Sequence, residues 1–272
     1  MGIKIGKDVE IHPTARINVE EGFIGDRSKI RAYAEINGRY VNIGSEAVIC
    51  EYAMIGGGNC YESDSSFIAG DFLHVGRNAF LNQGFDIKVG HECGLGVGTK
   101  LYTHGNYLSE WQGFPAKRGR IRIDNHVWIP NAQVNPGVNI GKNSVIMPMS
   151  LVTKDLPNGC LAGGIPCKVI KENAYPRILT EVERTQLWLE IFSGSVKKWY
   201  HKSHPEKLPC FGREELDVYK VNDMDGHITV FDLKQKTING DESLFSEILK
   251  NQLRRHGIRF RFYAKDGKYV RW

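Results

Sequence analysis

Residues 24–36 read Ile24-Gly-Asp-Arg-Ser-Lys-Ile30-Arg-Ala-Tyr-Ala-Glu-Ile36, with an isoleucine at every sixth position. The same spacing of aliphatic residues recurs from Ile5 to Leu101 and, after a break, from Ile123 to Val152. A small residue often stands two positions before the aliphatic one, as Ala34 does before Ile36. The chain therefore carries an internal repeat of six residues.

A period of six matches neither an α-helix, at 3.6 residues per turn, nor an amphipathic strand, at two. It fits short strands on the flat sides of a triangular coil, in which three hexads make one turn. The aliphatic side chains then point into the narrow interior, and the small residues fill the space beside the corners. An irregular β-sandwich with chance spacing is the alternative, which the many matches in register disfavour. Because 24 of the 30 glycines fall in residues 1–170, we expect the coil to end near residue 170.

The composition is that of a globular protein, with 272 residues, 41% hydrophobic and 25% charged. No apolar run is long enough to cross a bilayer. The segment Met1–Lys4 shows neither an apolar core nor a small-residue cleavage site, so we do not expect export. The six cysteines are scattered without a C-x-x-C motif, so we expect reduced thiols in a cytoplasmic protein. A net charge of +5 without a dense basic block argues against nucleic acid and suits an anionic small ligand.

The segment 123–170 is the most specific part of the repeat. It contains Ile123-Asp-Asn-His-Val-Trp-Ile-Pro, Val134-Asn-Pro-Gly-Val-Asn-Ile-Gly, Val152-Thr-Lys-Asp-Leu-Pro and Gly163-Gly-Ile-Pro-Cys-Lys-Val-Ile. These motifs resemble the closing coils of the hexapeptide-repeat family, among them the maltose, galactoside and polysaccharide-building acetyltransferases. The resemblance implies a mainly β fold, a left-handed parallel β-helix over residues 1–170 with a protruding loop. It also implies acetyl-CoA as cosubstrate and a homotrimer with active sites between subunits.

An insertion interrupts the repeat between Leu101 and Ile121. It begins Tyr102-Thr-His-Gly-Asn-Tyr and gathers a histidine, aromatic residues and cations in one loop. Acyl transfer to a hydroxyl needs a base that takes the proton, and imidazole exchanges a proton near neutral pH. A loop histidine taken alone is an ordinary surface residue, but Thr103-His104 matches the position of the family's catalytic histidine. The resemblance therefore implies that His104 is the general base and that the loop 105–120 reaches over a neighbouring subunit.

The resemblance also implies binding residues outside the loop. They are Asn82 and Trp128 for the acceptor, and Trp128, Thr153, Lys154, Gly163 and Lys168 for the coenzyme. A lysine beside a hydroxyl suits a phosphate, and glycine permits the close approach of an extended cofactor. The alternatives are a turn asparagine, a tryptophan that covers a corner, solvated lysines and glycines that only turn the chain.

Two departures from the family bear on these assignments. The interval from Asn82 to His104 is shorter than in the family's sugar acetyltransferases, and Pro130 stands where many relatives have glycine, so it removes a backbone N–H beside Trp128. The histidines are spaced too widely for the zinc-binding trio of hexapeptide carbonic anhydrases. We therefore expect no metal.

After Lys171 the six-residue period disappears. Thr180-Glu-Val-Glu183 is a capping box and predicts a helix over about 181–200, which we expect to pack on the coil or on a neighbouring subunit. Residues 171–204 then form a linker and this helix, and residues 205–272 form a small α+β domain. Its expected order is a hairpin of 218–221 and 228–233, a helix capped by Asp241 and closed by Gly257, and a hairpin of 258–263 and 269–272.

From residue 171 onward the chain carries 19 lysines and arginines against 15 acidic residues. This excess fits either contact with an anionic substrate carrier or a solvated domain surface.

The leading hypothesis is an O-acetyltransferase that moves an acetyl group from acetyl-CoA to a saccharide hydroxyl. A second hypothesis changes the acceptor to the amine of a nucleotide-linked amino sugar. A third is a hexapeptide scaffold without catalytic activity.

Overall fold

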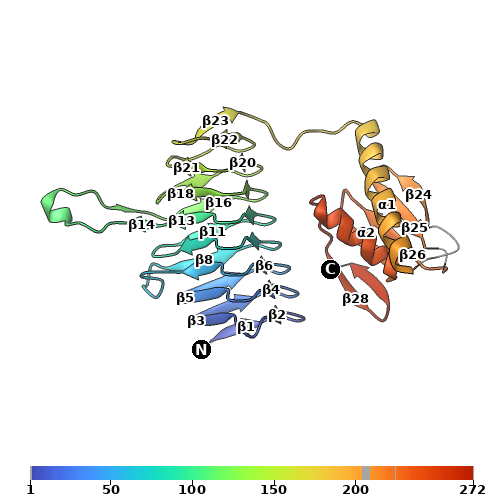
Figure 1. Ribbon diagram of the computed structural model, residues 1–272, viewed down its shortest axis with the longest axis horizontal. Helices are drawn as coiled ribbons and strands as arrows, with labels where there is room; N and C mark the ends of the chain where they lie inside the picture. Colours follow the sequence, from blue (N-terminus) through green and yellow to red (C-terminus); the bar gives the residue numbers. More distant parts are fainter. Residues whose placement is uncertain (1, 204–208, 224, 272) are drawn as a thin grey trace. The chain divides into compact units, whose positions relative to one another are not determined.

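The computed structural model describes residues 2–203, 209–223 and 225–271. The chain forms two compact units, Met1–Arg177 and Ile178–Trp272 (Figure 1). The sequence predicted a separate linker and helix over 171–204. In the structure the helix joins the C-terminal unit, because its apolar side chains are part of that unit's core. The predicted boundary at 204 and the end of the last predicted strand at residue 272 lie outside the described residues.

The N-terminal unit is a stack of coils made of short strands in two sheets (Figure 1). The twelve-stranded sheet contains β1(Ile3–Ile5), β3(Arg16–Ile24), β5(Glu35–Ile43), β7(Met54–Gly56), β8(Ser66–Ala69), β10(Phe80–Asn82), β11(Ile87–Val89), β13(Lys100–Tyr102), β16(Ile121–Ile123), β18(Ala132–Val134), β19(Asn139–Ile140) and β21(Ser150–Val152). The nine-stranded sheet contains β2(Glu10–Ile11), β4(Lys29–Ile30), β6(Val48–Ile49), β9(His74–Val75), β12(Gly94–Leu95), β17(Trp128–Ile129), β20(Val145–Ile146), β22(Leu161–Gly163) and β23(Lys168–Lys171).

The two sheets give the coil three sides. Strand β5 bends round a corner, because its first residues, Glu35–Ile36, pair with β7 while Tyr40–Ile43 pair with β8. The twelve-stranded sheet thus covers two sides and the nine-stranded sheet covers the third. Every described strand pair of the coil is parallel until β23, which runs antiparallel to β22. The unit is the left-handed parallel β-helix that the six-residue period and the resemblance predicted.

The aliphatic residues of the repeat fill the interior. Ile24, Ile30 and Ile36 come from the three different sides, and each is at most 1% exposed. Ala34, one of the predicted small residues, is fully buried beside them. Burying one such aliphatic side chain contributes roughly 1.5–3 kcal/mol, so successive coils stabilise each other through a continuous core. At the first coil the row of interior aliphatic residues is exposed to solvent, with Ile5 44% exposed.

The insertion in the repeat is a hairpin that projects from the coil (Figure 1). Strand β14(His104–Gly105) pairs antiparallel with β15(Lys117–Arg118), and the 3-10 helix η1(Glu110–Gln112) lies between them. Arg118 donates to both carboxylate oxygens of Glu110, with Nη1 to Oε2 at 3.2 Å. The guanidinium holds the pKa of Glu110 below its usual value through this hydrogen bond. The predicted protruding loop is therefore a two-stranded hairpin that this ion pair bridges.

The C-terminal unit is a six-stranded antiparallel sheet with two helices. Its strands, in chain order, are β24(Cys210–Glu215), β25(Val218–Asn222), β26(Ile228–Asp232), β27(Thr237–Asp241), β28(Phe262–Lys265) and β29(Lys268–Arg271). The predicted hairpins at 218–233 and 258–272 correspond to β25–β26 and β28–β29. The first strand of the second hairpin was predicted at 258–263 and lies at Phe262–Lys265. The sequence analysis missed β24 and β27, because neither has the clear alternation that marks a strand with one buried face.

Helices α1(Glu181–Ser203) and α2(Leu244–Arg255) complete the C-terminal unit. The capping box of α1 is confirmed, since the Glu183 backbone N–H donates to Thr180 Oγ1 at 3.2 Å and the Thr180 N–H donates to Glu183 Oε2 at 2.8 Å. The apolar face of α1 belongs to the core of the C-terminal unit, which corrects the expectation that it packs on the coil or on a neighbouring subunit. The sequence analysis predicted Asp241 as the N-cap of α2, but the N-cap in the structure is Ser243. No helix among the described residues combines the length and apolarity that crossing a membrane requires.

Candidate active site

One corner of the coil carries polar and glycine residues at matching positions. Strands β7, β10 and β13 lie side by side, with Gly56 opposite Asn82 and Asn82 opposite Tyr102. The chain leaves the coil for the hairpin directly after Tyr102, so His104 begins the hairpin at this corner. The register of the parallel strands therefore brings Asn82 and His104 to one place on the coil.

Thr103 fixes the backbone from which His104 projects. Its side chain is fully buried, and its Oγ1 donates to the Asn82 carbonyl at 2.7 Å and accepts from the Phe85 N–H at 3.0 Å. The Thr103 carbonyl accepts from the Gly119 N–H at 2.9 Å on the returning strand of the hairpin. These three bonds hold the base of the hairpin against the coil.

The imidazole of His104 packs against the backbone of two glycines, Gly84 and Gly58. A Cβ atom on Gly84 would lie 2.3 Å from Nδ1, and one on Gly58 would lie 3.9 Å from Nε2. Nδ1 is buried and has no hydrogen-bond partner among residues 2–203, 209–223 and 225–271. Gly84 therefore provides the space that the ring occupies. Nε2 faces the turn Gly56–Gly58, called the glycine turn below.

Asn82 lines the other side of the same glycine turn. A Cβ atom on Gly57 would lie 2.8 Å from Asn82 Oδ1, and this oxygen is buried without a partner in the described part of the chain. Buried polar atoms normally have hydrogen-bond partners. Two orphaned atoms at one corner, His104 Nδ1 and Asn82 Oδ1, mark a place where a polar ligand would complete the bonding.

The sequence analysis did not single out Gly57, Gly58 and Gly84. The run Gly56-Gly57-Gly58 is visible in the sequence and is a signal for close backbone approach, but Gly84 stands alone and carries no such signal.

We expect Gly84→Ala to lower kcat/KM by about 100-fold while the protein still folds, since a misplacement of about 1 Å near the reacting groups costs this much. Gly84 does not have a positive φ, so the added methyl group displaces the imidazole and leaves the backbone in place. Steady-state kinetics and a thermal melt measure the two effects. Gly105→Ala is the matched control, because a Cβ atom there meets nothing within 4 Å. Equal activity of the two variants would contradict the assignment.

Trp128 lies on a different side of the coil from His104. It belongs to β17 of the nine-stranded sheet, is 43% exposed, and covers Gly94, whose Cβ atom would lie 2.3 Å from the indole. A single chain therefore does not bring Trp128 and His104 into one pocket.

The four other predicted coenzyme residues lie at the last coils. Thr153 and Lys154 directly follow β21, and Gly163 of β22 pairs with Lys168 of β23. The segment after β22 lies against β21, because the Gly164 N–H donates to Ser150 Oγ at 3.1 Å and the Cys167 N–H donates to the Leu151 carbonyl at 2.8 Å. Lys154 and Lys168 are exposed. The close approach that Gly163 permits is to Met147, at 2.9 Å from its would-be Cβ atom.

The cysteines are free thiols in the structure, and Cys60, Cys93 and Cys160 are buried in the coil. Burial raises the pKa of the Cys93 thiol to about 11, so it stays protonated at neutral pH and packs as a small apolar side chain.

Asp223, Asp225 and His227 gather in the turn between β25 and β26, with side-chain ligand atoms within 4.8 Å of one another. Asp223 Oδ1 accepts from the backbone N–H groups of Asp225 and His227, at 3.1 and 3.2 Å. These bonds explain the cluster as a carboxylate that caps its own turn.

Comparison with known proteins identifies the class. No protein-family model matches the chain. The galactoside O-acetyltransferase of Escherichia coli strain K12 is 35% identical over 139 residues, which cover 47% of this chain and 68% of that protein. The galactoside O-acetyltransferase of Lactococcus lactis is 32% identical over 126 residues, covering 42% and 60%. A hexapeptide-repeat acetyltransferase from Vibrio cholerae, solved with acetyl coenzyme A, is 22% identical with a TM-score of 0.36, covering 61% of this chain and 69% of that one.

The coil of six-residue repeats and the sequence similarity place the protein among the hexapeptide-repeat acetyltransferases. Within that class, the chain belongs to the family of the galactoside O-acetyltransferases. The similarity covers part of the chain only, so it does not define the role of the C-terminal unit.

Proposed function

We propose that the protein transfers an acetyl group from acetyl-CoA to a hydroxyl of a saccharide, with His104 as the general base. The observation that carries this proposal is the corner where the hairpin leaves the coil. There the His104 ring lies against Gly84 and Gly58, beside Asn82, and the buried atoms His104 Nδ1 and Asn82 Oδ1 have no hydrogen-bond partner among the described residues. Membership in a family of sugar acetyltransferases supports the choice of donor and acceptor.

In the proposed reaction, Nε2 of His104 takes the proton of the acceptor hydroxyl as its oxygen attacks the thioester carbonyl. A C–O bond forms, the C–S bond breaks, and the imidazolium returns its proton to the departing thiolate. Asn82 Oδ1 accepts a hydrogen bond from a second hydroxyl of the saccharide and orients the acceptor. No covalent acyl-enzyme is needed, because the nucleophile is the acceptor oxygen itself.

The last coils would hold the coenzyme. Lys154 and Lys168 are exposed cations that suit its phosphates, and Thr153 adds a hydroxyl beside Lys154. Trp128 would line the channel toward the acetyl group.

A homotrimer with sites between subunits is part of the proposal. Trp128 and His104 lie on different sides of one coil, so a site that uses both requires a second copy. The hairpin also presents Tyr107 and Trp111, each 98% exposed in the single chain. Large exposed apolar side chains on a projecting hairpin favour contact with another subunit.

We expect acetyl-CoA and a galactoside, offered in a neutral and an acidic form, to give a product that carries one acetyl ester, detected by mass spectrometry. A nucleotide-linked amino sugar is offered in parallel. Mild base removes an ester and leaves an amide, so the treatment shows whether an oxygen or a nitrogen was acetylated. An alkali-stable product would support the amino-sugar hypothesis, and no transfer to any acceptor would support the scaffold hypothesis.

A further inference from the structure

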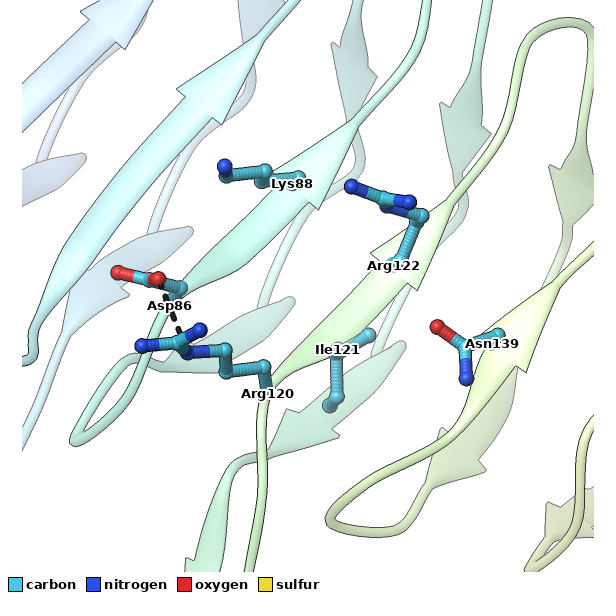
Figure 2. Close-up of a pocket in the computed structure, with 6 residues that line it drawn as sticks. All are labelled: Asp86, Lys88, Arg120, Ile121, Arg122 and Asn139. Atoms are coloured by element: carbon cyan, nitrogen blue, oxygen red, sulfur yellow. Dashed lines mark ion pairs between the residues drawn. The ribbon is translucent and has the colours of Figure 1, made fainter.

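A hollow of about 150 Å³ opens on the side of the coil that follows the hairpin (Figure 2). Strands β11, β16 and β19 form its floor, and it is lined by Asp86, Lys88, Arg120, Ile121, Arg122 and Asn139. Three of these six residues are cations. The sequence analysis included Arg120 in the loop 105–120 but assigned no binding role to any residue of the hollow.

Two of the cations stand at directly opposed positions. Lys88 of β11 pairs in register with Arg122 of β16, and Arg122 is followed in the same row by Asn139 of β19 (Figure 2). Like charges opposite each other on neighbouring strands destabilise a sheet. No ion pair or hydrogen bond joins either side chain to another described residue. An anion seated between them would offset this repulsion.

The third cation, Arg120, already forms an ion pair with Asp86. Arg120 Nε lies 3.2 Å from Asp86 Oδ2, and Asp86 Oδ1 accepts from Ser66 Oγ at 2.6 Å. Figure 2 shows the Arg120 guanidinium turned toward Asp86, and the ion pair that it marks joins these two residues and does not involve Lys88 or Arg122. The positive charge that remains uncompensated is therefore that of Lys88 and Arg122.

The hollow begins beside the proposed catalytic corner. His104 and Arg120 are the residues that follow Thr103 and Gly119, which share the hydrogen bond at the base of the hairpin. Asp86 lies two residues after Gly84, which contacts the His104 ring. The proposed coenzyme residues lie instead at the last coils, at β21 to β23. The hollow thus adjoins the acceptor side of the site.

We propose that this hollow binds the anionic group of an acidic saccharide, so that the acceptor carries a carboxylate or a sulfate. This inference rests on the proposed function, because it specifies the acceptor of the same site. Arg122 meets the anion with its planar guanidinium, and Lys88 adds a point charge. Asn139 Nδ2 donates one hydrogen to Asp155 Oδ2 at 3.0 Å, and its second hydrogen remains as a donor for the anion.

The test compares tetragalacturonate with neutral galactotetraose, using calorimetry for binding and acetyl-CoA-dependent turnover for activity. We expect the acidic tetrasaccharide to bind at least about 10-fold more tightly to the unmodified protein. Lys88→Gln and Arg122→Gln each weaken its binding by about 10-fold, as the loss of a charge-assisted contact predicts. Galactotetraose binding stays unchanged. Lys4→Gln is the matched control, because Lys4 is an exposed lysine in β1 of the same sheet, at the first coil.

The source of the anion is tested with coenzyme A in the same variants. A loss of coenzyme A affinity in Lys88→Gln or Arg122→Gln, with unchanged binding of tetragalacturonate, would assign the hollow to a coenzyme phosphate and overturn the inference. Equal binding of the two tetrasaccharides would also overturn it. Calorimetry needs no turnover, so it decides the hollow even if no acceptor is acetylated and the proposed function fails.

Discussion

Replacing His104 by alanine lowers kcat by about 100- to 10,000-fold, the range that a general base contributes. The variant keeps its fold, because His104 stands in a hairpin outside the buried core of the coil. Discontinuous assays of the acetylated product measure kcat. We expect calorimetry with coenzyme A to show that the coenzyme still binds. The matched control is His126→Ala, an exposed histidine at a turn of the coil. Turnover within a few-fold of the unmodified protein would show that the base is another group.

The same variant tests the arrangement between subunits. His104→Ala and Trp128→Ala each remove one part of a site whose parts lie on different sides of the coil. If two copies build the site, mixed assemblies of the two variants contain some sites with both His104 and Trp128. Co-refolding the two variants then restores part of the activity. Mixtures that stay as inactive as the separate variants would contradict a site shared between subunits.

Replacing Trp188 by alanine destabilises the C-terminal unit by about 3–5 kcal/mol, the usual cost of truncating a buried tryptophan. Trp188 of α1 is 1% exposed and stacks on Tyr219 of β25, with ring centroids 3.7 Å apart. Its loss leaves a cavity between the helix and the sheet. Urea unfolding followed by the helical circular dichroism signal measures the effect, since both described α-helices belong to this unit.

Leu189→Ala is the control for this prediction, because Leu189 is the next residue of α1 and is 47% exposed. We expect it to change the free energy of unfolding by about 0.5 kcal/mol or less. An equal loss in the two variants would show that the helix is sensitive to any truncation and that the stacking of Trp188 on Tyr219 has no special weight.

The coil could be predicted from the sequence because each hexad places one aliphatic side chain in the interior. Ile24, Ile30 and Ile36 are buried on three sides for one reason, so many weak signals add up. The C-terminal unit offers no repeat. Its strands β24 and β27 were missed because neither shows a clear alternation of apolar and polar residues. The partner of α1 was misplaced because periodicity shows which face is apolar but not what covers it.

The candidate site was predictable to a different degree. His104 and Asn82 were selected through the family resemblance, and the strand register brings them to one corner. The space that Gly84 leaves for the imidazole is a tertiary contact, which no local motif marks. Lys88 and Arg122 were missed because the hairpin insertion separates them in the sequence, although their strands are neighbours.

The open first coil and the antiparallel β23 make the two ends of the stack unequal. At the first coil, Ile5 still offers an uncovered aliphatic surface, whereas the reversed direction of β23 stops the parallel stacking. A whole coil added or lost near the start would keep the remaining coils in phase and leave His104 and Asn82 at the same corner. The number of coils at the N-terminal end can thus change, in evolution or by engineering, without moving the residues of the candidate site relative to one another.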